Sequence, residues 1–221
     1  MKRTCVQGRG SVLEELARAV AATTGNPLCP ESRRLFEQYL DLLVAWNRVH
    51  RLTAFESIDE IVRGLFIDSI LFFRLLPDGP LRVVDIGAGA GIPGIPLRIV
   101  DPRITLTLIE SRRRRASFLK TVVRAMGLRD TTVYEGRAEA IRGEVLERMG
   151  EFDVAVARAV APLAQLLPVA LGYLRSGGSL IVSGPPTGDG RIKESGDARV
   201  EIRRVEELGQ TRNFVVVPKI P

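Results

Sequence analysis

The feature that most constrains this chain is the glycine-rich segment Val83-Val84-Asp85-Ile86-Gly87-Ala88-Gly89-Ala90-Gly91-Ile92-Pro93-Gly94. A short apolar run ends in an aspartate, glycines follow at every second position, and the apolar residues 95–100 are typical of a helix. This order predicts a strand, a tight loop and the start of a helix. Because glycine lacks a Cβ and adopts positive φ, the loop backbone can bring its amide groups close to a ligand. The segment therefore indicates a site for a nucleotide-bearing ligand.

The glycines fit two spacing patterns, which predict different cofactors. Gly87, Gly89 and Gly91 form the GxGxG pattern of S-adenosylmethionine sites, whereas Gly89, Gly91 and Gly94 form the GxGxxG fingerprint of dinucleotide sites. The first pattern is favoured because Gly87 already ends the strand. Asp85 also suits the sulfonium and ammonium groups of S-adenosylmethionine better than a pyrophosphate. An NAD-dependent oxidoreductase and a plain structural turn stay open as alternatives.

Residues 1–80 show the apolar spacing of helices. We expect residues 1–10 to be frayed and helices to cover residues 11–23, 31–49 and 57–76, the last opened by a capping box at Ser57 and Glu60. Prolines and a glycine within residues 77–80 then end the helical part. The sequence thus predicts an N-terminal helical extension over residues 1–80 and a second domain over residues 81–221.

From residue 81 onward, strand-like and helix-like segments alternate. This alternation predicts an α/β fold with a parallel, doubly wound sheet and a ligand crevice at the carboxyl ends of the strands. A short link between the last two strands predicts an antiparallel hairpin, an ending common in methyltransferases. The expected strands are residues 81–86, 104–110, 131–134, 152–157, 179–183, 200–208 and 214–217, and the expected helices are residues 94–100, 112–127, 137–149 and 162–174.

Composition limits the class of protein. With 221 residues, 45% of them hydrophobic, the chain can bury a core. It lacks a membrane-length apolar run and a signal-peptide core, so we expect a soluble cytoplasmic protein. Cys5, Cys29 and the single histidine, His50, lack metal-site spacing, and we expect no metal. The net charge of +6 is concentrated in residues 81–184 as arginine, which favours a polyanionic partner such as nucleic acid.

Polar residues at the expected strand ends are candidates for cofactor binding. Glu110 ends the second strand, where an acid accepts hydrogen bonds from ribose hydroxyls in S-adenosylmethionine and NAD sites alike. After the third strand, the backbone N–H of Ala138 and the carboxylate of Glu139 are placed to contact the polar edges of adenine. Helix capping by Glu139 is the structural alternative.

The segment after the fourth strand, Ala157-Arg158-Ala159-Val160-Ala161-Pro162, bears on the chemistry. It lacks the Asn/Asp-Pro-Pro-aromatic run of amino-group methyltransferases and the cysteine of pyrimidine C5 enzymes. A ring nitrogen such as guanine N7 already has a lone pair, so methylation there needs alignment and exclusion of water but no general base. Arg158 would supply that alignment by holding a guanine acceptor, a phosphate or the cofactor carboxylate. An ion pair with Asp85 or Glu110 is the structural alternative.

Four arginines, Arg112, Arg113, Arg114 and Arg115, open the helix that follows the second strand. Cations at a helix N-terminus oppose the helix dipole. An unfavourable placement of this kind indicates an external anion, and RNA phosphate is the natural candidate. A solvated surface run is the alternative for part of the four.

Three of these motifs together resemble those of RsmG, the glucose-inhibited division protein B family: the segment from Asp85 to Leu97 with its double-proline GxPGxPL pattern, Gly136-Arg137-Ala138-Glu139, and the segment from Ala157 to Leu163. The similarity extends from residues 46–47 to residues 214–217. It implies a class I S-adenosylmethionine-dependent methyltransferase fold, Rossmann-like, with an N-terminal helical extension. It also implies methylation of N7 of one guanine in 16S rRNA of the small ribosomal subunit. By motif position, the cofactor contacts would be Gly87, Ile92, Ala138, Glu139 and Arg158.

Four positions depart from the usual family residues. Arg51 stands in place of an asparagine, Leu65 and Asn213 in place of histidines, and Ser183 in place of a lysine. We therefore expect that cofactor binding is kept while the rRNA contacts have shifted, with Arg51 joining Arg112–Arg115 as an RNA contact. A catalytically weakened RNA-binding protein is the alternative. We expect the protein to be a monomer.

Overall fold

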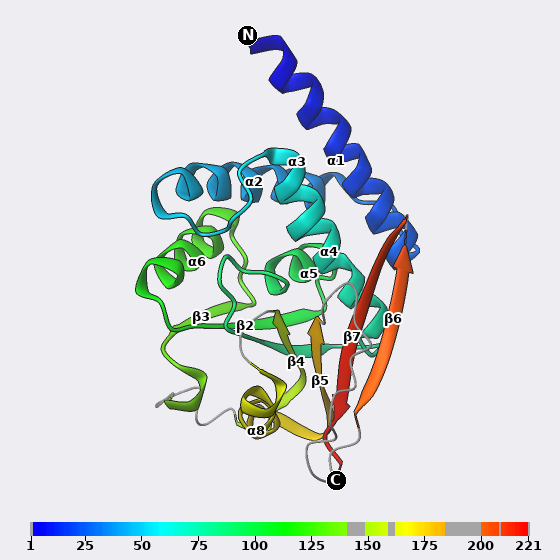
Figure 1. The fold of residues 1–221 in the computed structure, drawn as a ribbon, viewed down its shortest axis with the longest axis vertical. Helices are drawn as coiled ribbons and strands as arrows, with labels where there is room; N and C mark the ends of the chain where they lie inside the picture. Colours follow the sequence, from blue (N-terminus) through cyan, green and yellow to red (C-terminus); the bar gives the residue numbers. More distant parts are fainter. Residues whose placement is uncertain (1, 141–148, 159–161, 184–199, 208, 221) are drawn as a thin grey trace.

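The computed structural model describes residues 2–140, 149–158, 162–183, 200–207 and 209–220, with side chains from residue 9 onward. Its centre is a seven-stranded sheet in the order β3-β2-β1-β4-β5-β7-β6 (Figure 1). The strands β1 to β5 pair in parallel, and β7 pairs antiparallel with both β5 and β6. The predicted fold class, including the terminal hairpin, is confirmed. The strands are β1 (Leu81–Ile86), β2 (Ile104–Glu110), β3 (Thr131–Glu135), β4 (Phe152–Arg158), β5 (Leu174–Ser183), β6 (Glu201–Glu207) and β7 (Gln210–Pro218).

Helices cover both faces of this sheet because successive strand residues point to opposite sides. Val83 of β1 belongs to the core cluster shared with α5 (Gly94–Val100) and α6 (Arg113–Met126). Its neighbour Val84 belongs to the cluster shared with α8 (Leu163–Tyr173). The helices predicted over these three segments are confirmed. Of the helix expected over residues 137–149, the structure describes η3 (Ala138–Ala140), and residues 141–148 lie outside the described residues.

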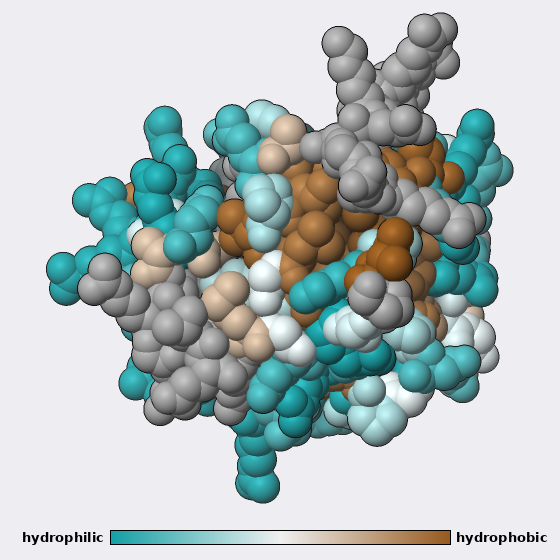
Figure 2. Space-filling view, turned by 90° about the horizontal axis from the view of Figure 1, so that it is seen from below, coloured by the Kyte–Doolittle hydropathy of each residue, from teal (hydrophilic) through white to brown (hydrophobic). Residues whose placement is uncertain are grey.

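The face that carries α8 has an apolar centre. Figure 2 shows this end of the molecule, where hydrophobic residues gather in the middle and hydrophilic side chains border them. On α8 itself, Leu163, Val169 and Leu171 are only partly buried. The other face of the sheet is covered more deeply, because a further layer of helices lies above α5 and α6 (Figure 1).

This further layer consists of the N-terminal helices. The helix α2 (Pro30–His50) contacts α5 and α6, and α1 (Lys2–Thr24) contacts the segments that follow α2. The expectation that residues 1–10 are frayed is wrong, because α1 begins at Lys2. One cause is a contact that apolar spacing does not reveal: Arg9 donates hydrogen bonds to the Asp41 carboxylate (2.6 Å) and to the Glu37 carbonyl (3.4 Å) of α2.

The third predicted helix, residues 57–76, is broken into short pieces. The capping box at Ser57 and Glu60 is confirmed, but α3 (Ile58–Ile61) continues as a π-helical turn η1 (Val62–Ile67), then α4 (Asp68–Ile70) and a 3-10 turn η2 (Leu71–Leu75). In the π-helical turn, Gly64 packs against the Phe55 ring so closely that a Cβ would lie 2.7 Å from Cζ. Its carbonyl accepts a hydrogen bond from Arg158 (2.8 Å). Such wide turns occur frequently at functional sites.

The helical layer and the sheet share one hydrophobic core. Phe36 and Phe66 of the N-terminal helices lie in the same cluster as Leu106 and Val154 of the sheet. The division into residues 1–80 and 81–221 therefore stays a prediction about chain organisation. In the described part of the chain, no helix combines the length and apolarity needed to cross a lipid bilayer.

One residue in this layer has an unfavourable backbone conformation. Arg51 ends α2 with φ 47° and ψ 57°, in the left-handed region, which costs most L-residues energy and which asparagine tolerates better. We predict that Arg51→Asn raises the free energy of unfolding by about 1 kcal/mol in urea denaturation. The control Arg48→Asn, in the last turn of α2, should lower it by roughly 0.5 kcal/mol. Equal effects of the two changes would contradict this account.

Candidate functional site

The site is built on the glycine loop between β1 and α5. The loop turns sharply after β1, with φ of 71°, 61° and 92° at Gly87, Gly89 and Gly91. Its first amides, at Gly87 and Ala88, donate to the Ile109 carbonyl of β2 at 2.9 Å each. Gly94 has no positive φ and begins α5. The turn is therefore made by the glycines of the GxGxG pattern, which is the S-adenosylmethionine reading of the segment.

Two carboxylates hold this loop by accepting hydrogen bonds from its backbone amides. Asp85 is completely buried, and its Oδ2 accepts a hydrogen bond from the Gly94 amide (2.9 Å). Burial raises the pKa of Asp85 to about 7, and the charge of Glu110 adds to this rise. Glu110 accepts the Gly89 amide (2.8 Å) at one oxygen and the Arg112 amide (2.7 Å) at the other. Asp85, expected as a cofactor contact, is thus buried against the start of α5, where it supports the loop.

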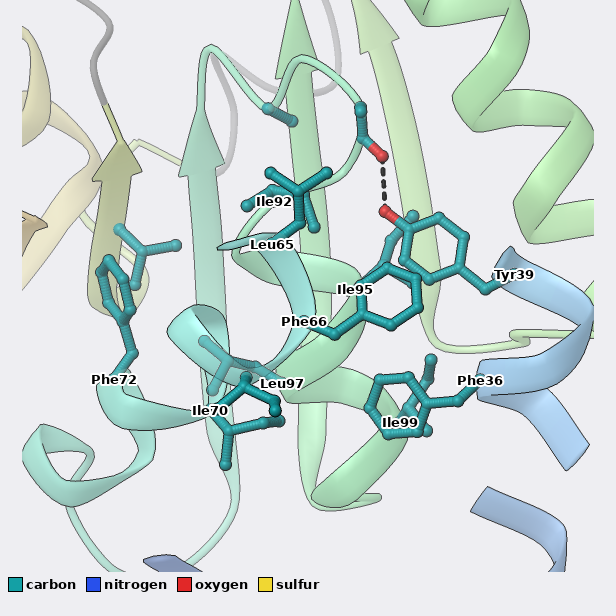
Figure 3. Packing of buried hydrophobic residues seen from close by; sticks show 14 of the residues in the cluster. Phe36, Tyr39, Leu65, Phe66, Ile70, Phe72, Ile92, Ile95, Leu97 and Ile99 are labelled. Atoms are coloured by element: carbon teal, nitrogen blue, oxygen red, sulfur yellow. Dashed lines mark hydrogen bonds between the residues drawn. The ribbon is translucent and has the colours of Figure 1, made fainter. Parts of the chain in front are cut away.

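A tyrosine of α2 also holds the loop. The Tyr39 hydroxyl of α2 donates to the Ala90 carbonyl at 2.5 Å, the dashed line in Figure 3. The Tyr39 ring stacks on Phe66 with centroids 4.9 Å apart, and burial raises the pKa of Tyr39 well above its usual value. Gly91 is required beside this contact, because a Cβ there would lie 3.0 Å from the Tyr39 hydroxyl and would overlap Ile95 Cδ1. From the sequence, Tyr39 is only one residue of the helix expected over residues 31–49, since its loop partner lies 51 residues away.

A cavity of about 490 Å³ opens beside the loop. It brings together most of the predicted cofactor contacts and two of the predicted RNA contacts. Gly91 and Asp85 are not among the described residues that line it. They shape the loop through the turn at Gly91 and the hydrogen bond of Asp85 to the Gly94 amide. Its lining residues are Leu52, Thr53, Phe55, Leu65, Gly87, Ala88, Gly89, Ala90, Ile92, Glu110, Ser111, Arg112, Arg115 and Arg158.

A second cavity, of about 280 Å³, adjoins the first and shares Gly87 and Ser111 with it. Ala138 and Glu139 line it, as expected for an adenine site, together with apolar side chains of β2 and α8. Tyr173 of α8 donates to the Ala138 carbonyl (2.7 Å) and fixes this turn. Burial, with a smaller contribution from the Glu139 charge, raises the pKa of Tyr173 to about 12. Sequence analysis missed Tyr173, which carries no motif signal.

Arg158 extends from the end of β4 into the first cavity. Its Nη2 donates to the Gly64 carbonyl (2.8 Å), and its Nη1 lies 3.4 Å from Oδ2 of Asp68. Burial lowers the pKa of Arg158, and the Asp68 charge opposes this effect. The alternative that Arg158 pairs with Asp85 or Glu110 is wrong, because its acidic partner comes from the N-terminal helices instead.

A third cavity, of about 990 Å³, lies between the N-terminal helices and the segment of residues 51–57. We call it the basic groove, because Arg9, Arg48, Arg51 and Arg115 line it against the acids Glu56 and Asp59. It shares Leu52, Thr53 and Arg115 with the first cavity, so the two adjoin. Within the described residues, no acidic side chain pairs with Arg48, Arg51, Arg112 or Arg115.

The run Arg112–Arg115 is thereby divided into two pairs. Arg112 and Arg115 line cavities, whereas Arg113 and Arg114 are exposed and line none of those described. This division follows from the helix: α6 begins at Arg113, and successive residues point around its axis.

Three of the four departures from the family pattern lie around Arg158. Leu65 lines the first cavity, directly after Gly64. Ser183 is the register partner of Arg158 on β5, and Ser183 in turn pairs with Phe214, the neighbour of Asn213. The fourth, Arg51, lines the basic groove. Leu65 thus changes the lining of the first cavity, and Arg51 changes that of the basic groove.

Together the two adjoining cavities suit an adenosine-containing cofactor with an amino-acid tail. Their walls offer backbone amides of a glycine loop, the Glu110 carboxylate and the Arg158 guanidinium. These groups match hydroxyls, a cationic centre and a carboxylate, the polar groups of S-adenosylmethionine. Among the residues that the structure describes, no three His, Cys, Asp or Glu side chains are grouped as metal ligands.

Comparison with known proteins agrees with this geometry. Residues 32–184 match the model of the GidB family, described as rRNA small subunit methyltransferase G. The chain is 36% identical to ribosomal RNA small subunit methyltransferase G of Clostridium kluyveri, covering 93% of this chain and 90% of that protein. It is 38% identical to the protein of that name from Roseiflexus castenholzii, over 87% and 80% of the two chains.

Solved structures show the same fold at low sequence identity. A SAM-dependent methyltransferase from Aquifex aeolicus superposes with a TM-score of 0.58 at 15% identity, covering 77% of this chain and 97% of that one. A putative S-adenosyl-L-methionine-dependent methyltransferase from Methanococcus maripaludis gives a TM-score of 0.57 at 16% identity, over 74% and 91% of the two chains. The shared architecture is that of class I methyltransferases.

The buried Asp85 generates a prediction about pH. Its pKa of about 7 in the folded protein lies above the value of 3.8 for an ordinary aspartate. Between these values the folded state binds more protons than the unfolded state, so the Asp85 contribution to stability falls as pH rises from about 4 to 7. We predict that the stability of Asp85→Asn relative to the unsubstituted protein increases over this window by up to about 1.4 kcal/mol per pH unit. Urea denaturation at several pH values measures this difference, and parallel profiles would contradict it.

Proposed function

Because the chain belongs to the GidB family of rRNA small subunit methyltransferases, we propose that it transfers the methyl group of S-adenosylmethionine to N7 of a guanine in 16S rRNA. The observation that carries this proposal is the position of Arg158 beside the glycine loop in one cavity. No cysteine and no histidine is among the described residues that line this cavity. This composition supports attack by a lone pair already present on the base, which needs neither a covalent enzyme intermediate nor a general base.

Each cofactor-side residue then has a role that its position supports. The loop amides around Gly87 and Ile92 enclose the methionine end of the cofactor, and Glu110 accepts the ribose hydroxyls. Ala138 and Glu139 border the adenine in the second cavity. Arg158 holds the cofactor carboxylate through its planar guanidinium fork. When bound, the cofactor would supply an electrophilic sulfonium methyl group.

The basic groove is our candidate path for the RNA. It adjoins the first cavity, which we now call the cofactor cavity, along Arg115, Leu52 and Thr53. A nucleotide held in the groove would therefore have its base at the mouth of the cofactor cavity. Arg51 and Arg115 would contact phosphates on this path, and Arg112 would do so at the cavity itself. We propose that the protein acts as a monomer in the cytoplasm, on the RNA of the small ribosomal subunit.

A second candidate function is RNA binding with weakened catalysis. The observation that favours it is the clustering of Leu65, Ser183 and Asn213 around Arg158, where the family usually has two histidines and a lysine. A leucine, a serine and an asparagine in place of two histidines and a lysine would weaken contacts to the acceptor base while the cofactor loop is kept.

Methyl transfer distinguishes the two functions. We predict that the purified protein binds S-adenosylmethionine in calorimetry and adds one methyl group to a guanine of 16S rRNA, located by mass mapping of nuclease fragments. Arg158→Ala should reduce the methylation rate by at least about tenfold and leave RNA affinity within about twofold. Cofactor and RNA binding without methylation would support the weakened alternative, and absence of cofactor binding would contradict both.

The divided arginine run tests the RNA path. We predict that the double variant Arg112→Gln, Arg115→Gln weakens RNA binding and reduces the slope of log affinity against log salt by about 1–2. The matched control Arg113→Gln, Arg114→Gln removes the same charge from the same turn and should change the slope by less than about half as much. Electrophoretic mobility shifts over a salt series measure both. Equal losses would place the RNA on the exposed helix surface instead.

A further inference from the structure

A buried carboxylate lies between two arginines behind the cofactor cavity. The side chain of Asp68, at the start of α4, is 2% exposed. Arg212 of β7 donates from Nε to its Oδ1, and Nη1 of Arg158 lies 3.4 Å from its Oδ2. The two arginine side chains are themselves only 23% and 20% exposed. Three distant segments of the chain, the N-terminal helices, β4 and β7, therefore meet at one charge cluster.

We propose that Asp68, neutralised by Arg212, is a positioning residue that fixes the Arg158 guanidinium for the carboxylate of the cofactor. This inference rests on the proposed function, in which Arg158 is a cofactor contact. Gly64 and Asp68 belong to one short segment and engage Nη2 and Nη1 of Arg158 respectively. Two points of attachment on one side fix the plane of the guanidinium, which a single contact would leave free to rotate.

The unfilled hydrogen-bonding capacity of the cluster supports a ligand. Nη1 of Arg158 and Oδ2 of Asp68 are both buried, and neither makes a hydrogen bond with any described residue. Buried polar atoms are ordinarily paired, so an exception needs an explanation. A carboxylate entering the cavity would supply Nη1 with the acceptor that Asp68, at 3.4 Å, does not fully provide.

Arg212 is needed because of the charge balance. With Arg158 and Arg212 around one aspartate, the cluster carries a formal charge of about +1 and attracts an anionic group. Without Arg212, Asp68 would pair with Arg158 alone, and the cluster would be neutral. Asp68 would then compete with the cofactor carboxylate for the same guanidinium. Arg212 thus keeps Arg158 available. It does so through Asp68, because Arg212 is not among the described residues that line the cavity.

The test compares two ligands in calorimetry, S-adenosylmethionine and methylthioadenosine. Methylthioadenosine keeps the adenosine and a neutral methylthio group but lacks the amino-acid tail with its carboxylate. We expect Asp68→Asn and Arg212→Gln each to weaken S-adenosylmethionine binding about tenfold and methylthioadenosine binding less than about twofold. Arg212→Lys, which keeps the charge, should restore most of the affinity. In an Arg158→Ala background, Asp68→Asn should add less than about twofold, because the residue through which it acts is gone.

The matched control is Asp101→Asn. Asp101 is also buried and pairs with an arginine, Arg103, at 2.7 Å. It precedes β2 and so lies at the amino ends of the strands, whereas the cavity lies at their carboxyl ends. It should lower stability without changing the affinity for either ligand. If Asp68→Asn weakens both ligands equally, or behaves like Asp101→Asn, the positioning role is overturned while the methyltransferase proposal stands. If the unsubstituted protein binds neither ligand, the proposed function itself fails. Should Asp68→Asn not fold, the pair Arg212→Gln and Arg212→Lys decides the question.

Discussion

The hydrogen bond from the Tyr39 hydroxyl to the Ala90 carbonyl joins the N-terminal helices to the glycine loop. It lies in a fully buried environment, where an unpaired hydroxyl or carbonyl would be costly, so the two elements hold each other in place. Tyr39 stacks on Phe66 of the π-helical turn, and that turn and the start of α4 supply Gly64, Leu65 and Asp68 to the surroundings of Arg158. The helical layer is therefore part of the site, and its removal would expose the loop and free the arginine.

The sequence was sufficient for the fold because the relevant signals are local. Alternating strands and helices, the glycine spacing at residues 87–91 and the terminal hairpin each depend on residues close together in the chain. Acidic and basic residues at strand ends, such as Glu110 and Arg158, could be placed near the loop because parallel strands end at one edge. Their detailed partners could not be assigned. Asp85 supports the loop through the Gly94 amide. Its position at a strand end does not specify this partner.

The contacts that could not be predicted from the sequence join residues far apart in the chain. Arg158 is 94 residues from Gly64, and Arg212 is 144 residues from Asp68. No periodicity connects such pairs, and Asp68 in particular lies in an apolar stretch where it reads as a helix residue. The π-helical turn was missed for the same reason, since its stabilising contacts with Phe55 and Arg158 come from outside the helix. The sequence does hold one signal for Asp68. An aspartate within an apolar run is expected to be buried, and a buried charge needs a partner.

Arg115, Leu52 and Thr53 form the wall that the basic groove and the cofactor cavity share. On the RNA path proposed above, an acceptor base would pass this wall to reach the loop, so neighbouring residues would align the base and bind the RNA strand. The arginines of the groove are exposed enough to act through salt-screened attraction, whereas Arg158 is held in a buried cluster that salt screens far less. In the proposed function, affinity for RNA and orientation of the cofactor would therefore depend on arginines in different dielectric surroundings. A substitution in the groove can therefore change the substrate without disturbing the chemistry.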